Sequence, residues 1–163
     1  MAFGLLQSTV YVQLRPERLT LRHVQSGRSV SGPPIAAIAS GPKPALVAVG
    51  EAALTPPPDR PVKVINPFKH PRTLLADFTL GEQVLKAFMR KLFEGSLFAR
   101  SPLVVLHPRI DPEGGFTQIE LRALHELALG AGASKVILWK GGELNDAQLR
   151  ELDFSSGGEV LNA

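Results

Sequence analysis

The chain has 163 residues, of which 44% are hydrophobic and 20% charged, so its size and composition fit one globular domain and exclude intrinsic disorder. The absence of cysteine excludes disulfides, thiol catalysis and thiolate metal sites, and it fits a reducing compartment, so we expect a cytoplasmic protein. The formal net charge is only +3 and basic residues are scattered among acidic ones, which excludes the concentrated basic surface of a nucleic-acid-binding protein.

The first part of the chain has the alternating pattern of a β-meander. Strands are predicted at residues 8–14 and 19–24, joined by the turn Arg15-Pro16-Glu17-Arg18, and a third strand is predicted at residues 29–39. A proline pair inside the third strand suits only a sheet edge or a bulge, because proline donates no ladder hydrogen bond.

A proline-rich stretch follows at residues 40–78. Within it, Thr55–Asp59 is predicted to be a turn or an extended loop, and Leu46–Val49 is a candidate for a short buried strand. We interpret the stretch as an irregular insertion.

The second half of the chain changes to helical periodicity. Apolar residues recur at helical spacing from Thr79 to Leu92 with charged residues between them, which predicts an amphipathic helix. Further elements are predicted in this order: a buried strand at 103–106, a helix at 120–129 ended by Gly130-Ala131-Gly132, a strand at 136–139, and a short capped helix at 145–152. Residues from about 153 to 163 are predicted to form a flexible tail.

The order of these elements predicts an α/β fold. An antiparallel meander followed by strand, helix, strand, helix and strand gives a mixed sheet, in the order that ribonuclease H-like and actin-like domains share. We therefore expect a single such domain over residues 1–163.

Several short segments in the right order resemble the first domain of bacterial actins of the rod-shape-determining MreB family. They are Val64–Lys69, Leu75–Phe78, Thr117–Leu124 and Gly130–Val136. The resemblance covers about residues 45 to 139 and implies an actin-like fold. It also implies a truncated first domain, because the sequence stops where the family's second domain should begin.

The resemblance raises the question of nucleotide binding, because actin-like ATPases hold nucleotide with an Asp-x-Gly-Thr turn between their first strands. In this chain Gln13 replaces the acid, Arg15 replaces the glycine, and Pro16 removes a backbone donor. No second glycine-rich phosphate loop follows Lys140–Glu143. We therefore expect a pseudo-ATPase with no bound cofactor and no ATPase activity.

Glu120 is the one candidate for a relic of catalysis, because it matches the position at which the family places the carboxylate that orients the attacking water. Thr117-Gln118-Ile119-Glu120 also has the spacing of a capping box, in which Glu120 bonds back to the start of its helix. We favour this structural role.

Other catalytic patterns are weak. The four histidines lack the H-x-x-x-H or H-E-x-x-H spacing of a metal site, so no metal is expected. The segment from His107 to Gly115 follows a strand, where α/β proteins often bind ligands, and Asp111 and Glu113 could act as acid or base there. A surface loop with turn residues is the simpler interpretation.

Leu97 and Phe98 form an apolar step in a short connection, and Arg100 is close to them in sequence. Apolar residues beside basic ones suit insertion beneath anionic lipid headgroups, and the MreB resemblance points to membrane contact by the corresponding loop. We predict that Leu97, Phe98 and Arg100 contact a membrane or a partner; the alternative is that the apolar side chains fold back onto the domain.

The leading hypothesis is a non-catalytic, truncated actin-like domain that acts as a binding or structural module of the cell-shape cytoskeleton, peripheral to the inner membrane. Its expected partners are a full-length bacterial actin or another cell-shape protein, and an anionic membrane surface. One alternative is half of an ATP-binding actin-like ATPase that another chain completes. Another is an unrelated soluble protein-binding adaptor, since one fold can serve many functions.

Overall fold

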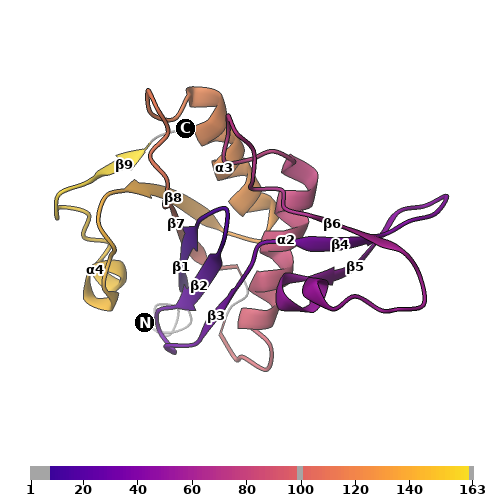
Figure 1. Ribbon diagram of the computed structural model, residues 1–163. Helices are drawn as coiled ribbons and strands as arrows, with labels where there is room; N and C mark the ends of the chain where they lie inside the picture. The colour runs from indigo at the N-terminus through magenta and orange to yellow at the C-terminus, as the bar shows by residue number, and fades with distance from the viewer. Residues whose placement is uncertain (1–7, 99–100, 162–163) are drawn as a thin grey trace.

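The computed structural model describes residues 8–98 and 101–161, which are built around a central six-stranded sheet (Figure 1). Its strand order is β3-β2-β1-β7-β8-β9. The strands are β1 (Thr9–Leu14), β2 (Leu19–His23), β3 (Ser29–Gly32), β7 (Leu103–Pro108), β8 (Lys135–Lys140) and β9 (Glu159–Leu161). The strands β1, β7 and β8 are parallel to one another, and β2, β3 and β9 join by antiparallel pairing. The predicted mixed sheet of an actin-like α/β fold is confirmed.

One face of the sheet is covered by α2 (Phe78–Leu92) and α3 (Gln118–Gly130). The side chain of Asp77 caps α2, and the chain leaves α3 through Gly132 at φ +116°, a conformation that favours glycine. The two helices pack closely at Gly81, where a Cβ would lie 3.3 Å from Cδ1 of Leu127. The predicted helices are therefore present, and both bury apolar stripes in the main core.

The opposite face carries a smaller apolar cluster around Trp139, which is fully buried. It is covered by α4 (Asp146–Glu151), whose Leu149 is also fully buried, and by the chain leading into β9. A Cβ on Gly141 or Gly158 would lie 2.6 Å or 2.5 Å from the indole ring, so both positions need glycine to seat Trp139. Residues 159–161 are thus a paired strand, and the prediction that residues 153–163 form a tail is wrong for them.

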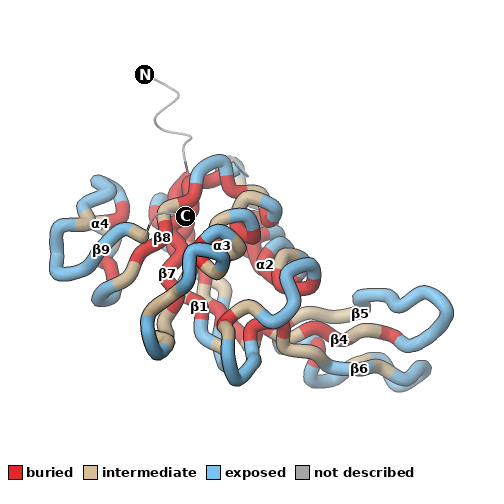
Figure 2. The backbone as a smooth tube through the Cα atoms, turned by 90° about the horizontal axis from the view of Figure 1, so that it is seen from above, coloured by how far each residue is buried: buried red, intermediate tan, exposed pale blue. Residues whose placement is uncertain are grey.

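A second, three-stranded sheet has the order β5-β4-β6 and consists of β4 (Ala36–Ala39), β5 (Ala45–Val49) and β6 (Val62–Ile65). Figures 1 and 2 show it projecting from the body on the side away from α4 and β9. A 3₁₀ helix, η1 (Gly50–Leu54), lies between β5 and β6. We call this second sheet with η1 the arm.

The arm corrects two sequence-based predictions. The strand predicted at residues 29–39 is split into β3 and β4 in different sheets, because the intervening proline pair cannot continue a ladder. Residues 40–78 are not an irregular insertion, since β5 and β6 both pair with β4 and satisfy its backbone groups.

Among the described residues, none of the helices combines the length and the apolar character that a bilayer-spanning segment requires.

Candidate functional site

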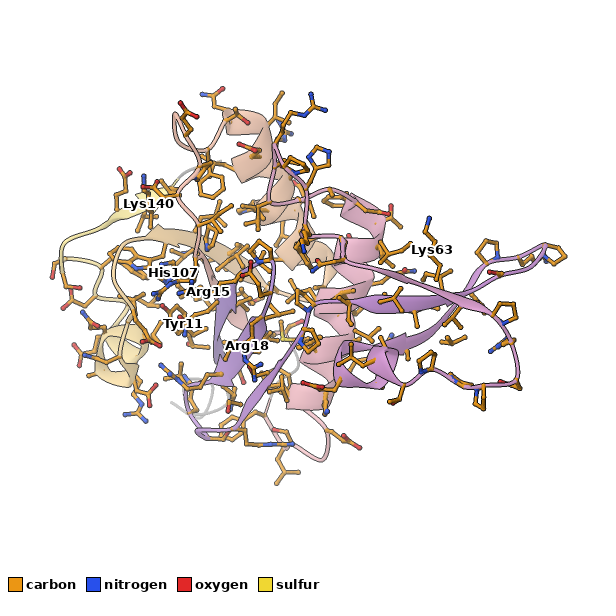
Figure 3. The ribbon with its side chains drawn as sticks, viewed as in Figure 1. Tyr11, Arg15, Arg18, Lys63, His107 and Lys140 are labelled. Carbon is orange, nitrogen blue, oxygen red and sulfur yellow. The ribbon has the colours of Figure 1, made fainter. Side chains whose placement is uncertain are left out.

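A group of polar side chains lies where the parallel strands β1 and β7 end, on the face that α4 covers. Gln13 of β1 and His107 of β7 are register partners, and both side chains lie on the same face as Tyr11. Figure 3 shows Tyr11, Arg15 and His107 on one side of the molecule, far from Lys63 on the arm. The carboxyl ends of parallel strands are where open α/β sheets usually bind ligands.

Tyr11 and His107 form the buried centre of this group. The Tyr11 hydroxyl lies 2.6 Å from Nδ1 of His107, and both residues are at most 2% exposed. The backbone N–H of Leu144 donates to the same hydroxyl over 3.2 Å. Since the hydroxyl oxygen already accepts from Leu144, its own proton is free to be donated to Nδ1 of a neutral imidazole.

The pKa values of the pair agree with this assignment. Burial, together with the positive charge of Arg109, lowers the pKa of His107 to about 4, while a backbone hydrogen bond with Gly141 acts in the opposite direction. Burial raises the pKa of the Tyr11 phenol. Both groups are therefore neutral near pH 7.

A chain of side-chain hydrogen bonds crosses the ends of the strands beside this pair. Arg109 Nη1 donates to Gln13 Oε1 over 3.1 Å, and Gln13 Nε2 donates to Glu143 Oε1 over 3.0 Å. Farther out, Lys140 Nζ lies 3.4 Å from Asp111 Oδ1. Gln13 thus links Arg109, which follows β7, to Glu143, which follows β8. These polar side chains are hydrogen-bonded to one another at this edge of the sheet.

The turn from Arg15 to Arg18 closes on itself. The Arg15 N–H donates to the Arg18 carbonyl over 2.9 Å, and the Arg18 N–H donates to the Arg15 carbonyl over 3.3 Å. Pro16 has no N–H, and its carbonyl accepts from Asn66 Nδ2 over 2.6 Å. A phosphate-binding turn needs free backbone N–H groups that converge on the ligand, and these two are already used.

The capping box predicted for Glu120 is confirmed. The Thr117 N–H donates to Glu120 Oε2 over 2.8 Å, and the Glu120 N–H donates to Thr117 Oγ1 over 3.1 Å. Both reciprocal bonds of the motif are present at the start of α3. The Glu120 carboxylate is therefore bonded to Thr117, the N-cap residue of its own helix.

Leu97 and Phe98, the apolar pair before β7, lie in two different environments. Leu97 is 96% exposed. Phe98 instead packs against the main core, and its ring centroid lies 4.6 Å from that of His23 in an edge-to-face arrangement. Leu97 therefore has the exposure that contact with a membrane or a partner requires, whereas Phe98 follows the alternative and packs back onto the domain against His23. Arg100 lies outside the described residues.

The sequence points to His107, Gln13 and Asp111 separately, but it does not show that they meet. It gives no indication that Tyr11 and Glu143 join them. The available signal was the placement of Tyr11 and His107 in otherwise apolar strands, but only the strand register shows that they meet. Within residues 8–98 and 101–161, no three His, Asp or Glu side chains are grouped closely enough to hold a metal ion.

Comparison with known proteins gives a consistent pattern. The family described as MreB/Mbl protein matches residues 19–144. The cell shape-determining protein MreB of Haemophilus influenzae is 29% identical over 143 residues, which cover 83% of this chain and 38% of that protein. The Escherichia coli (strain K12) protein named "Uncharacterized protein YjaA" is 28% identical over 133 residues, covering 78% of this chain and 80% of that protein.

Solved structures show the same fold. The crystal structure of MreB5 of Spiroplasma citri bound to ADP superposes with a TM-score of 0.61 at 21% identity, covering 82% of this chain and 38% of that one. The chain thus spans less than two fifths of the length of the MreB relatives that it matches.

Proposed function

Since the chain belongs to the MreB/Mbl family, we propose that it is a non-catalytic actin-like domain that serves as a binding or structural module in bacterial cell shape. The observation that carries this proposal is the turn after β1. Its Arg15 and Arg18 N–H groups bond within the turn, and Gln13 stands where the family has an acid and is held by Arg109 and Glu143. A turn whose N–H groups are used in this way supports the proposal that the domain is a pseudo-ATPase.

Glu120 supports the same conclusion. To orient an attacking water, its carboxylate would have to leave the Thr117 N–H and hydroxyl, which it contacts at 2.8 Å and 3.2 Å. That movement would break the reciprocal half of the capping box and leave the Thr117 N–H without its carboxylate partner. The alternative of half an ATPase completed by another chain therefore requires two local rearrangements, one at Glu120 and one at the Arg15–Arg18 turn.

We further propose that the partner is a full-length bacterial actin. The support is the membership of the chain in the MreB/Mbl family and the fold that it shares with MreB5 of Spiroplasma citri. Sedimentation of the purified chain with polymerised MreB tests this, with sedimentation of the chain alone as the control. A chain that stays in the supernatant in the presence of MreB filaments removes the proposed partner.

A weak peripheral contact with an anionic membrane is proposed for Leu97, because this residue is 96% exposed. Burial of one leucine contributes about 1.5–3 kcal/mol, which gives only reversible attachment. Flotation with anionic liposomes should decrease on Leu97→Ser and stay unchanged on Leu54→Ser, a matched exposed leucine on the arm. Equal flotation of both variants and the wild type removes the membrane contact from the proposal.

A further inference from the structure

His23 is a titratable side chain that two phenylalanine rings enclose at the end of β2. It is 2% exposed and lies on the same face of β2 as Leu21 of the main core. Its ring centroid lies 5.3 Å from that of Phe93 and 4.6 Å from that of Phe98, and both contacts are edge-to-face. Phe93 directly follows α2, and Phe98 belongs to the connection between α2 and β7. The His23 ring therefore joins this connection to the central sheet.

The hydrogen bonds of His23 require a neutral ring with its proton on Nε2. Nδ1 accepts from the Ser26 N–H over 3.3 Å and lies 2.6 Å from Ser26 Oγ. That oxygen accepts from the Arg28 N–H over 3.2 Å, so the hydroxyl proton is available for Nδ1. Nε2 lies 3.0 Å from Ser8 Oγ, to which it donates. A proton added to Nδ1 would therefore meet two hydrogen-bond donors.

The charges around His23 also oppose a second proton. Burial lowers the pKa of His23, and the positive charge of Arg28 lowers it further. The neighbouring residues of β1 are uncharged, and Arg22 lies on the opposite face of β2, beside Tyr11. The charged residues at the end of α2 and in the connection after it are Arg90, Lys91, Glu94 and Arg100, of which Arg100 lies outside the described residues. A protonated His23 therefore needs contact with water, which the closed core excludes.

Phe98 is held on the domain by its side chain rather than by a strand or a helix. Its N–H donates to Ser96 Oγ over 3.1 Å, and the Ser96 N–H donates to the Phe93 carbonyl over 2.9 Å, so both bonds stay close to the connection. Leu97, the neighbour of Phe98, is 96% exposed. An outward movement of the Phe98 ring thus requires no break in the sheet.

The turn on the other side of the His23 ring is more firmly attached. The His23 N–H donates to the Arg28 carbonyl over 2.8 Å, and the Gly27 N–H donates to the His23 carbonyl over 2.9 Å. These bonds tie the turn that carries Ser26 to β2. Water therefore reaches the ring more readily by movement of Phe98 than by movement of this turn.

We propose that Phe98 is a pH-dependent latch: when Nδ1 of His23 takes up a proton, Phe98 leaves the core and joins Leu97 on the surface. Above about pH 6.5 the ring is neutral and the latch stays closed. As pH falls, the open state takes up the proton first, because water reaches the ring there, and the equilibrium shifts toward opening. Two apolar side chains then meet the membrane instead of one, a step that rests on the membrane contact proposed for Leu97.

NMR of the full chain tests the latch without a membrane. At about pH 8 the ring protons of His23 should show nuclear Overhauser contacts with those of Phe93 and Phe98. As the imidazole shifts report protonation, the contact with Phe98 should be lost, while the contact with Phe93 should remain and show that the core is intact. A Phe98 contact that survives protonation, or the loss of both contacts together, overturns the proposal.

Flotation with vesicles of phosphatidylglycerol and phosphatidylcholine measures the consequence. The vesicle binding constant of the wild type should rise by about tenfold between about pH 8 and about pH 5.5, because a second apolar side chain is then available for burial. Phe98→Ser should bind like the wild type at the higher pH and gain nothing at the lower one. Melting temperatures confirm that the variants keep their fold.

Two histidine variants assign the pH dependence. His23→Gln, which stays uncharged, should abolish the rise, and His70→Gln, which alters an exposed histidine, should keep it. A rise that persists in His23→Gln overturns the proposal. Absence of flotation at both pH values would instead remove the membrane contact of the proposed function, and the NMR contacts would still decide the latch.

Discussion

The hydroxyl of Tyr11 lies 2.6 Å from Nδ1 of His107 and also receives the backbone N–H of Leu144. One buried side chain thus links two parallel strands to the segment that follows β8. Arg22 reinforces this link, since its guanidinium carbon lies 5.6 Å from the centre of the Tyr11 ring and its Nε lies 3.0 Å from Asp146 Oδ1. The face that α4 covers is therefore held by a polar network as well as by apolar packing.

Removal of the hydroxyl in Tyr11→Phe should destabilise the fold by about 1–3 kcal/mol, because it leaves the Leu144 N–H and the His107 nitrogen buried without a partner. Denaturant unfolding measures the change. Ser31→Ala, which removes an exposed hydroxyl, should stay within about 0.5 kcal/mol. A Tyr11→Phe variant as stable as the wild type would show that the network contributes nothing.

Stability should depend on pH through His107. Its folded pKa of about 4 lies below the usual 6.5, so the unfolded chain takes up the proton first as pH falls. The stabilisation is present above pH 6.5 and is lost between 6.5 and about 4, by up to about 3 kcal/mol. His23, whose pKa burial also lowers, adds a loss of the same sign.

The slope of unfolding free energy against pH checks this assignment. It should shrink in His107→Gln and persist in His70→Gln, which alters an exposed histidine. An unchanged slope in His107→Gln would show that this histidine does not cause the acid sensitivity.

Gly158→Ala should destabilise the fold by about 1–3 kcal/mol, because the new methyl group would lie 2.5 Å from the Trp139 ring and force overpacking. Gly142→Ala is the matched control, since nothing lies within 4 Å of a Cβ there. Thermal melts compare the two variants. Equal stability of both would mean that the chain around Gly158 does not pack on Trp139.

The capping box gives a graded prediction for α3. Thr117→Ala should cost about 1 kcal/mol, because it removes the acceptor of the Glu120 N–H. Glu120→Gln should have a small effect, since an amide oxygen can still accept from the Thr117 N–H. If Glu120→Gln abolished an activity without changing the melt, the catalytic hypothesis would replace the structural one.

The parts of the fold that sequence predicted are those with a strong local pattern. The amphipathic stripe of α2, the apolar run of β7 and the capping box of α3 are all readable within a few residues. The strand predicted at Leu46–Val49 is present as β5, although it is not buried. The sheet that joins β5 and β6 to β4 was missed, because these strands are short and their pairing depends on tertiary contacts.

The candidate site was less predictable than the fold. The substitutions at Gln13, Arg15 and Pro16 were visible in the sequence, but the partners that occupy Gln13 were not. The bond between Tyr11 and the Leu144 N–H joins residues 133 positions apart, which no local pattern reports. The packing of Phe98 onto the domain was not readable from the local sequence, because its partner, His23, lies on a distant strand.

Isothermal titration of the purified chain with Mg-ATP tests the central claim most directly. The N–H groups of the Arg15–Arg18 turn are bonded within the turn, and Gln13 is bonded to Arg109 and Glu143. We therefore expect no saturable heat of binding up to about 1 mM ATP, a concentration that corresponds to a binding free energy of about 4 kcal/mol. Saturable binding at micromolar concentration, about 8 kcal/mol, would contradict the account and show that the domain keeps a functional nucleotide site.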